Sequence, residues 1–429
     1  MEIKTYPNPT FQIRPTKNYR SILISKVREI IKKVKINGDS ALKFYAKKFD
    51  RCSSWKDIQV LEEDIESSIK LVSKSFKKSI EQAYKNIEFF NLNQIYHKFI
   101  RLKSISGVLC WYKTFPIGKV GLYIPGGSAP LFSTVLMLGI PARLAQCKNI
   151  ILCTPPNFSG NIHTNIIYAS RRVGIRKIYK TGGAQAISAM TFGTQSIPSV
   201  DKIFGPGNIY VTIAKQILSQ ECLVSIDMPA GPTEVGIIAD EISSIKYVAD
   251  DMISQAEHGT NSQIVLISPK KYWGESVKKE LNRKIYNQPK RFLVKESFKN
   301  SCIILVPSLE EGLDIANQYS PEHLILNFLE SDRYSEKIRN AGSVFLGAYS
   351  PESVGDYASG PNHVLPTKGY ARTFGGLSMD SFLKKISFQK LSKEGLEKIS
   401  ETVKTMSVSE VLNAHAFSVQ SRIRNKNND

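Results

Sequence analysis

Short β-branched runs alternate with helical segments through most of this chain, and this alternation restricts the fold more than any other feature. Between residues 119 and 227 the runs are KVGLYIP, NIILCTP, RKIYK, DKIF and LVSID. They are separated by helical patterns that begin near Ala129, His163, Ala184 and Asn208. Strands that alternate with helices are typical of a parallel sheet, whose neighbouring strands need a crossover connection. We therefore expect an α/β fold.

A second alternating segment begins at EVGIIAD and continues through SQIVLISP, CIILVPS, EHLILNF and SVFLG, which predicts a second parallel sheet. A chain of 429 residues also exceeds what one hydrophobic core usually organises. We expect the helical stretch at 24–105 to pack on the second sheet. The expected parts are an N-terminal arm at 1–23, a discontinuous α/β domain at 24–122 and 235–376, an inserted α/β domain at 123–234, and a helical tail at 377–429.

Composition excludes several classes of protein. The first residues, MEIKTYPNPT, lack the apolar core of a signal peptide, and no apolar run is long enough to cross a bilayer. We therefore expect a cytoplasmic protein without a membrane partner. The formal charge of +20 would suit a nucleic-acid partner, but the lysines are spread over the whole chain, often beside acidic residues. We expect no specific nucleic-acid site.

Three glycine-rich turns, PGGSAP, TGGAQ and GPGN, each lie between a strand end and a helix start. Free backbone N–H groups at such turns can approach a phosphate, so a dinucleotide would suit this sheet. The GxGxxG fingerprint is absent, because Tyr210 stands where the third glycine after Gly205 and Gly207 belongs. Glycine turns are also what βα connections ordinarily need.

The stretch SQAEHG at 254–259 lies at the end of a helical pattern that starts near Ile242. Gln255 and His258 are three residues apart, so one helix face could present both to a metal ion, with Gly259 as the C-terminal cap. The alternative is a histidine that complements the dipole of the helix. The six cysteines form no CxxC pair, so any metal must be bound by other residue types.

Two further stretches place polar residues where a core would not. PEHL puts Glu322 and His323 at the start of an apolar strand, where an acid and an imidazole could share proton transfer. The alternative is a strand that begins at a proline and has polar leading residues. The glycine- and proline-rich segment SPESVGDYASGPNHVLPT holds Asp356 and His363, and long irregular segments in compact chains are usually functional. Near the C-terminus, His415 lies on an expected helix, and Glu410 has capping-box spacing from Ser407.

Eight motifs occur in an order that resembles the histidinol dehydrogenase family over essentially the whole chain. They are GLYIPGGSAPLFSTVLM, GGAQAI, DKIFGPGN, DMPAGPTEV, SQAEHG, PEHL, AGSVFLG and GDYASGPNHVLPT. The resemblance implies an enzyme that oxidises L-histidinol through L-histidinal to L-histidine with two NAD⁺ and one Zn²⁺ per subunit. We therefore expect two Rossmann-like parallel-sheet domains, incomplete and without GxGxxG, with a short N-terminal arm and a small helical C-terminal tail domain.

The resemblance also implies roles for individual residues. The implied zinc ligands are Gln255, His258, Asp356 and His415. The implied proton-transfer residues are Glu322 and His323, and the implied NAD⁺ contacts are Tyr123, Gln185 and Asn208. The implied substrate contacts are Thr233, Gln255, His258, His323, Asp356, Glu410 and His415. It assigns no role to His363. It further implies a homodimer, in which we expect the short tail to be exchanged between subunits.

The chemistry of the two oxidations leaves an alternative open. His323 would take the alcohol proton, and Glu322 would activate the water that converts the aldehyde into its hydrate. A competing route would use a thiohemiacetal on Cys110, Cys147 or Cys153, although small buried cysteines are usually packing residues. Two rival functions are a zinc hydrolase, which would have no use for three glycine turns at strand ends, and a basic binding protein, which would retain DNA or RNA in a salt-sensitive way without needing a metal.

Overall fold

The computed structural model of the chain describes residues 1–6, 20–52, 57–94, 101–126, 129–229 and 231–424. It divides into two compact units. The first comprises residues 1–94 and 117–382, and the second comprises residues 95–116 and 383–429.

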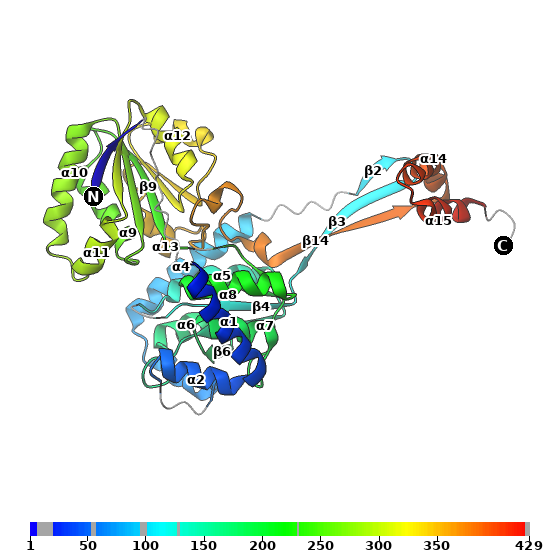
Figure 1. The fold of residues 1–429 in the computed structure, drawn as a ribbon, viewed down its shortest axis with the longest axis horizontal. Helices are drawn as coiled ribbons and strands as arrows, with labels where there is room; N and C mark the ends of the chain where they lie inside the picture. Colours follow the sequence, from blue (N-terminus) through cyan, green and yellow to red (C-terminus); the bar gives the residue numbers. More distant parts are fainter. Residues whose placement is uncertain (7–19, 53–56, 95–100, 127–128, 230, 425–429) are drawn as a thin grey trace. The chain divides into compact units, whose positions relative to one another are not determined.

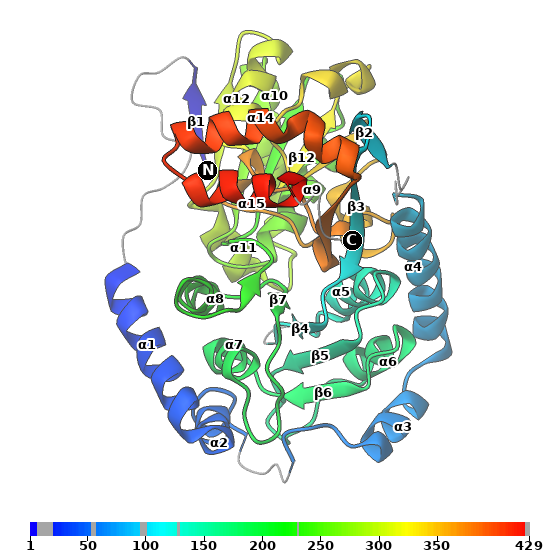
Figure 2. The same ribbon diagram turned by 90° about the vertical axis from the view of Figure 1, so that its right-hand side faces the viewer.

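The first unit contains a parallel five-stranded sheet with the order β6-β5-β4-β7-β8. Its strands are β4 (Lys119–Tyr123), β5 (Asn149–Thr154), β6 (Lys177–Lys180), β7 (Lys202–Phe204) and β8 (Ser225–Ile226). The connecting helices are α5 (Phe132–Leu144), α6 (Thr164–Arg172), α7 (Gly183–Phe192) and α8 (Ile209–Glu221). The α/β alternation expected from the sequence is therefore confirmed, as Figure 2 shows.

The strand order of this sheet reverses between β4 and β7. In order of appearance the strands lie 3-2-1-4-5, which is the Rossmann-like arrangement, and ligands of such sheets bind beyond the carboxyl ends of the strands at the reversal. The GPGN turn follows β7 at this edge, and Asn208 caps α8 by accepting hydrogen bonds from the amides of Tyr210 and Val211. The TGGAQ turn leads into α7, whose N-cap residue is Gly182. Residues 127–128 of the PGGSAP turn lie outside the described residues.

The four N-terminal helices surround the five-stranded sheet. They are α1 (Arg20–Asn37), α2 (Asp39–Phe49), α3 (Glu62–Lys70) and α4 (Lys74–Asn93). Helix α1 contacts α7 and α8, α2 contacts α7, α3 contacts α6 and α4 contacts α5 (Figure 2). Val27 and Leu42 are buried in one core with Ile187 and Val211. The expectation that these helices pack on the second sheet is therefore wrong, because an amphipathic helix can bury its apolar face against either sheet. The expected domain boundaries, which would separate independently folding parts, stay a prediction.

The second parallel sheet has six strands in the order β1-β11-β10-β9-β12-β13 (Figure 1). Its strands are β1 (Glu2–Thr5), β9 (Glu234–Ala239), β10 (Gln263–Ser268), β11 (Cys302–Leu305), β12 (His323–Asn327) and β13 (Ser343–Leu346). Helices α9 (Ile245–Ala256), α10 (Lys271–Ile285) and α11 (Arg291–Phe298) share one core with the sheet, and α12 (Leu309–Tyr319) lies in another. The start of the expected N-terminal arm is thus an edge strand, β1.

Shorter elements follow β12 and complete the first unit. They are η1 (Ser331–Lys337), α13 (Glu352–Tyr357), η2 (Tyr370–Arg372) and η3 (Met379–Phe382). The segment SPESVGDYASGPNHVLPT is therefore not wholly irregular, because its first part forms α13. None of the described helices is long and apolar enough to cross a membrane.

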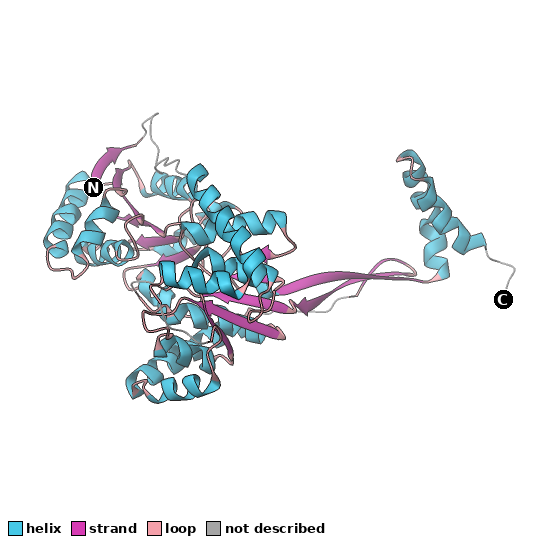
Figure 3. Cartoon of the chain, turned by 60° about the horizontal axis from the view of Figure 1, so that its bottom comes forward, coloured by secondary structure: helices cyan, strands magenta, loops and turns pink. Residues whose placement is uncertain are grey.

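The second unit contains an antiparallel sheet with the order β14-β3-β2 and two helices (Figure 3). The strands are β2 (Leu102–Ile105), β3 (Val108–Pro116) and β14 (Leu383–Leu391), and the helices are α14 (Lys393–Ser409) and α15 (Asn413–Arg424). Helices in the expected tail at 377–429 are confirmed, and β14, which lies within this range ahead of them, was not expected. All nine residues of β14 pair with β3, so the tail is joined to a strand far away in sequence.

Candidate active site

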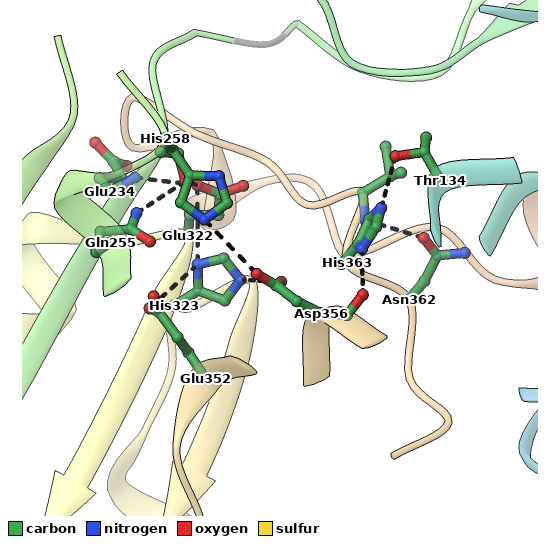
Figure 4. Close-up of polar contacts among 12 residues, drawn as sticks. Thr134, Glu234, Gln255, His258, Glu322, His323, Glu352, Asp356, Asn362 and His363 are labelled. Carbon is green, nitrogen blue, oxygen red and sulfur yellow. Dashed lines mark hydrogen bonds and ion pairs between the residues drawn. The ribbon is translucent and has the colours of Figure 1, made fainter. Parts of the chain in front are cut away.

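The site lies at the amino ends of β9 and β12 in the six-stranded sheet (Figure 4). Glu322 directly precedes β12 and His323 is its first residue, as the PEHL motif predicted. Because β12 pairs in parallel with β9, with His323 opposite Val235, the residues that lead into β9 lie beside Glu322. These residues are Thr233 and Glu234. The last turn of α9 brings Gln255 to the same place.

Glu322 is a buried carboxylate, 7% exposed, held by two donors from the neighbouring strand. Its Oε2 accepts a hydrogen bond from the Thr233 hydroxyl and another from the backbone amide of Glu234 at 3.0 Å. Burial raises the pKa of Glu322 to about 7, and the charge of His323 and the hydrogen bonds only partly offset this effect. A carboxyl group with such a pKa can release and accept a proton near neutral pH.

Three carboxylates surround the imidazole of His323. Nδ1 lies 3.9 Å from Oε2 of Glu322 and 4.0 Å from Oε2 of Glu352, and Nε2 lies 3.6 Å from Oδ1 of Asp356. Burial alone would lower the pKa of His323, but Glu322, Asp356 and Glu352 together outweigh it and raise this pKa to about 10. Among the described residues Nδ1 has no hydrogen-bond partner, so the two carboxylates near it act through their charge.

Glu352 was not found by sequence reasoning, although it lies one helical turn before Asp356 on α13. Its side chain is fully buried, and burial raises its pKa to about 8. With its amide nitrogen toward Glu352, Gln255 donates to Oε1 of that carboxylate at 3.0 Å. Its oxygen then lies 2.8 Å from the Thr233 hydroxyl oxygen and 2.8 Å from the Glu234 amide nitrogen. Because the hydroxyl has one proton, it donates either to Gln255 or to Glu322 at a given moment. We adopt this orientation because the opposite one turns the amide oxygen toward the carboxylate.

His258 and Asp356 face each other across the open side of the site. Nε2 of His258 lies 3.8 Å from Oδ2 of Asp356, and the side chain of His258 is 45% exposed. Helix α9 ends at Ala256, so His258 follows the helix instead of lying on its face, and Gly259 is not a left-handed cap. Partial burial lowers the pKa of His258, which favours the neutral imidazole that metals bind. Burial would raise the pKa of Asp356, but the hydrogen bond and charge of His323 lower it overall.

The zinc set implied by the sequence is only partly assembled by these contacts. Within the described parts of the chain, no group of three or more His, Cys, Asp or Glu side chains is arranged to hold a metal ion. His258 and Asp356 fit two positions of such a site, and one neutral imidazole with one carboxylate is a donor pair that zinc accepts. The amide of Gln255 is engaged by Thr233, Glu234 and Glu352. The four-ligand set therefore stays a prediction.

His363, to which the family resemblance assigns no role, has a polar contact at each ring nitrogen. Its Nδ1 lies 2.7 Å from the backbone oxygen of Asp356, and its Nε2 lies 3.1 Å from the hydroxyl of Thr134 on α5. The neighbouring Asn362 donates to the carbonyl of Met137 on the same helix at 2.5 Å. The segment after Asp356 is thus attached to α5.

The three residues expected to contact NAD⁺ lie at the strand ends and helix starts of the five-stranded sheet. Tyr123 ends β4, and its hydroxyl accepts a hydrogen bond from the amide of Gly183 at 3.1 Å. Burial raises the pKa of Tyr123 to about 12, so the phenol remains a neutral donor. Gln185 lies buried in the first turn of α7, and Asn208 caps α8. Their contacts with a cofactor stay a prediction.

The remaining expected residues belong to the second unit. His415 lies on α15, and Glu410 is the C-terminal cap of α14. The expected capping box is wrong, because α14 continues to Ser409 and Ser407 lies inside it. The parts that Glu410 and His415 play in the site stay predictions.

Burial disfavours two of the three cysteines considered for the thiohemiacetal route. Burial raises the pKa of Cys147 to about 11 and that of Cys153 well above its ordinary range. Cys110 lies on β3 of the second unit. A nucleophilic cysteine needs a thiolate, which such burial disfavours.

Comparisons with known proteins agree on one family. The family model described as histidinol dehydrogenase matches residues 13–423. The histidinol dehydrogenase of Bacteroides thetaiotaomicron is 47% identical over 415 residues, which cover 96% of this chain and 95% of that protein. The chloroplastic histidinol dehydrogenase of Arabidopsis thaliana is 44% identical, covering 99% of this chain and 90% of its own. The crystal structure of histidinol dehydrogenase from Elizabethkingia anophelis superimposes with a TM-score of 0.95 at 45% identity, covering 100% of this chain and 99% of its own.

Proposed function

Since the chain belongs to the histidinol dehydrogenase family, an NAD-dependent oxidoreductase of histidine biosynthesis, we propose that it oxidises L-histidinol through L-histidinal to L-histidine, with two NAD⁺ and one bound Zn²⁺ per subunit. The observation that carries this proposal is the cluster in which Glu322, His323 and Asp356 converge at the amino edge of the six-stranded sheet. An alcohol oxidation followed by an aldehyde oxidation needs a proton acceptor for each step, and this cluster supplies two. We further propose that the enzyme acts in the cytoplasm.

In the alcohol step, His323 accepts the hydroxyl proton while the carbon gives up a hydride. The imidazole must be neutral to do so, although its three carboxylate neighbours favour the protonated ring. Glu322 and Glu352 lessen this conflict, because each has a raised pKa and lies within 4.0 Å of Nδ1, so the uphill transfer of the ring proton to one of them costs less free energy than transfer to an ordinary carboxylate. The proton of the resting ring can pass to one of these carboxylates before the alcohol proton arrives.

In the aldehyde step, water must first add to the carbonyl, because only the hydrate carries a hydrogen that can leave as hydride. Glu322 takes a proton from that water, and Thr233 and the Glu234 amide fix the direction of its carboxylate. The second oxidation then yields the acid and releases a proton from the hydrate. Two oxidations thus use two hydride acceptors and one water.

Zinc would be held by His258 and Asp356, with Gln255 and His415, and would orient the imidazole and amine of the substrate. The chain's own polar groups would do the remaining positioning. We assign substrate contacts to Thr233, Gln255, His258, His323, Asp356, Glu410 and His415. NAD⁺, the hydride acceptor, would lie against Tyr123, Gln185 and Asn208 at the carboxyl edge of the five-stranded sheet, where the strand order reverses.

We also propose a homodimer in which the second unit supplies Glu410 and His415 to the site of the partner. Two observations support exchange. Among the described side chains of α14 and α15, the buried ones are Gly395, Ser407 and Ala416, so these helices lack an apolar core of their own. Met406, Val411 and Phe417 are at the same time 60%, 80% and 66% exposed, as expected of a surface that a partner covers.

The test is a product assay on the purified, zinc-loaded protein. With L-histidinol and NAD⁺ we expect L-histidine, two reduced nicotinamides for each histidinol consumed, and no product when either compound is omitted. His323→Asn is the matched negative control. If the loaded protein reduces no NAD⁺ while it hydrolyses an ester or amide, the site is that of a zinc hydrolase instead.

A further inference from the structure

A buried ion pair lies beneath the GPGN turn, away from the proton-transfer cluster. Lys215 is on α8 and Asp227 follows β8, and their side chains are 3% and 1% exposed. Neither residue was singled out by the sequence, and the proton-transfer cluster does not include them. Buried charges are costly to desolvate, and such a pair often stabilises a fold less than apolar residues of the same size.

The pair binds the backbone of Gly205 from both sides. Asp227 Oδ2 accepts a hydrogen bond from the amide of Gly205 at 2.7 Å, and Lys215 Nζ donates one to the carbonyl of Gly205 at 3.0 Å. Asp227 Oδ1 contacts Lys215 and accepts from the amide of Met228 at 2.8 Å. Both polar groups of one glycine are thus bound to charged side chains.

Gly205 itself has a conformation that glycine adopts more readily than other residues. Its φ of +125° lies in the region that side chains disfavour, and a Cβ at this position would lie 2.1 Å from the backbone oxygen of Tyr123. The turn therefore runs directly against the end of β4 before it reaches Asn208. The ion pair thus binds a residue that approaches the backbone of Tyr123 and leads, within the same turn, to Asn208, and both of these are expected cofactor contacts.

We propose that Lys215 and Asp227 are positioning residues for the dinucleotide: they hold the GPGN turn in the shape that places Asn208 and the end of β4 for NAD⁺. The inference rests on the proposed binding of NAD⁺ at the five-stranded sheet. Neither side chain touches the cofactor in this scheme. Each acts through the backbone of Gly205, so its loss should weaken cofactor binding and leave the proton-transfer residues unchanged.

The principal variant is the double substitution Lys215→Met with Asp227→Asn, which removes both charges and leaves no unpaired buried ion. We expect the KM and Kd for NAD⁺ to rise about tenfold or more, because misplaced contacts lose binding free energy steeply. The KM for histidinol should stay within about twofold of the parent at saturating NAD⁺. Asp227→Glu is a second variant, which keeps both charges and displaces the carboxylate by one methylene. It should raise the KM for NAD⁺ in the same direction.

The matched control is Arg172→Met with Glu81→Gln. This pair joins α6 to α4 around the same sheet, with N–O distances of 2.7 and 2.8 Å, and does not touch the turn. It should lower the melting temperature without changing the KM for NAD⁺. A melting temperature lowered equally in both double variants, with an unchanged Kd for NAD⁺ in both, would show that Lys215 and Asp227 only stabilise the fold.

Failure of the inference is distinguishable from failure of the proposed function. If the parent protein binds no NAD⁺ by calorimetry, the proposed function fails. If the parent binds NAD⁺ and the folded double variant binds it equally well, the positioning role is overturned. Should the double variant not fold, the same comparison is made with Asp227→Glu, and an unchanged Kd there also overturns the role.

Discussion

The hydroxyl of Thr134 lies 3.1 Å from Nε2 of His363, whose Nδ1 lies 2.7 Å from the backbone oxygen of Asp356. A carbonyl oxygen can only accept, so Nδ1 carries the proton and Nε2 accepts from the Thr134 hydroxyl. Burial lowers the pKa of His363 and favours this neutral tautomer. His363 therefore links the backbone of Asp356 to α5, the helix that follows the first glycine turn of the five-stranded sheet.

Thr134→Val should destabilise the protein by about 1–2 kcal/mol, because it keeps the shape of the side chain but leaves Nε2 of His363 without its donor. We also expect a lower kcat/KM for histidinol, since Asp356 loses part of its support. Thr134→Ser retains the hydroxyl and should resemble the parent in both urea unfolding and kinetics. Equal unfolding free energies of the valine and serine variants would contradict this role for the hydrogen bond.

The fold could be predicted from the sequence where the pattern is local. The composition and length of the apolar runs identify β4 and β12. Glu322 and His323 lie at the start of a strand, as the PEHL motif indicated. The partner of an amphipathic helix is not encoded locally, so α1 to α4 were assigned to the wrong sheet. Glu352 was missed for a related reason. Its burial follows from contacts with Gln255 and His323, which are distant in sequence.

The roles of the two proposed proton acceptors, His323 and Glu322, can be distinguished by supplying histidinal directly. His323→Asn should impair the alcohol step more severely than Glu322→Gln, because the imidazole serves the alcohol proton and the carboxylate serves the water. With histidinal as substrate, Glu322→Gln should be the slower of the two, measured by single-turnover reduction of NAD⁺. If Glu322→Gln oxidises histidinal at the parent rate, the assignment of Glu322 to water is wrong.

Asp251 on α9 should make stability depend on pH. It is 8% exposed, and burial, assisted by the charge of Asp250, raises its pKa from 3.8 to about 7. Because this pKa is raised in the folded state, the contribution of protonated Asp251 to folding stability is complete below the unfolded pKa and is lost as the pH rises toward 7. Relative to the parent, the free energy of unfolding of Asp251→Asn should increase by up to about 1.4 kcal/mol for each pH unit between the unfolded pKa of 3.8 and the folded pKa of about 7. Above this window the difference should not grow further. Urea unfolding of both proteins from pH 5 to about 8.5 measures this difference, and a constant difference would contradict the shift.

Removal of the metal should abolish activity and leave the fold nearly intact. His258 and Asp356 are attached to α9 and α13, and the six-stranded sheet beneath them has extensive apolar cores of its own. This differs from a small zinc-stabilised module, which unfolds without its metal. After chelation we expect circular dichroism close to that of the loaded protein and recovery of activity when zinc is returned. Loss of the helical signal together with activity would indicate a structural metal.

Exchange of the second unit between subunits predicts that two inactive variants can restore each other. His258→Ala removes a residue that the first unit contributes to the active site, and His415→Ala removes one that α15 of the second unit contributes. In an exchanged heterodimer, one site collects both defects and the other has none, whereas each homodimer has two defective sites. Unfolding the two variants together and refolding them should therefore recover about a quarter of parent activity if pairing is random. Refolding each variant alone is the control and should recover none. If heterodimers form, as mass spectrometry can establish, and activity stays absent, then each site is built from a single chain and His415 acts within its own subunit.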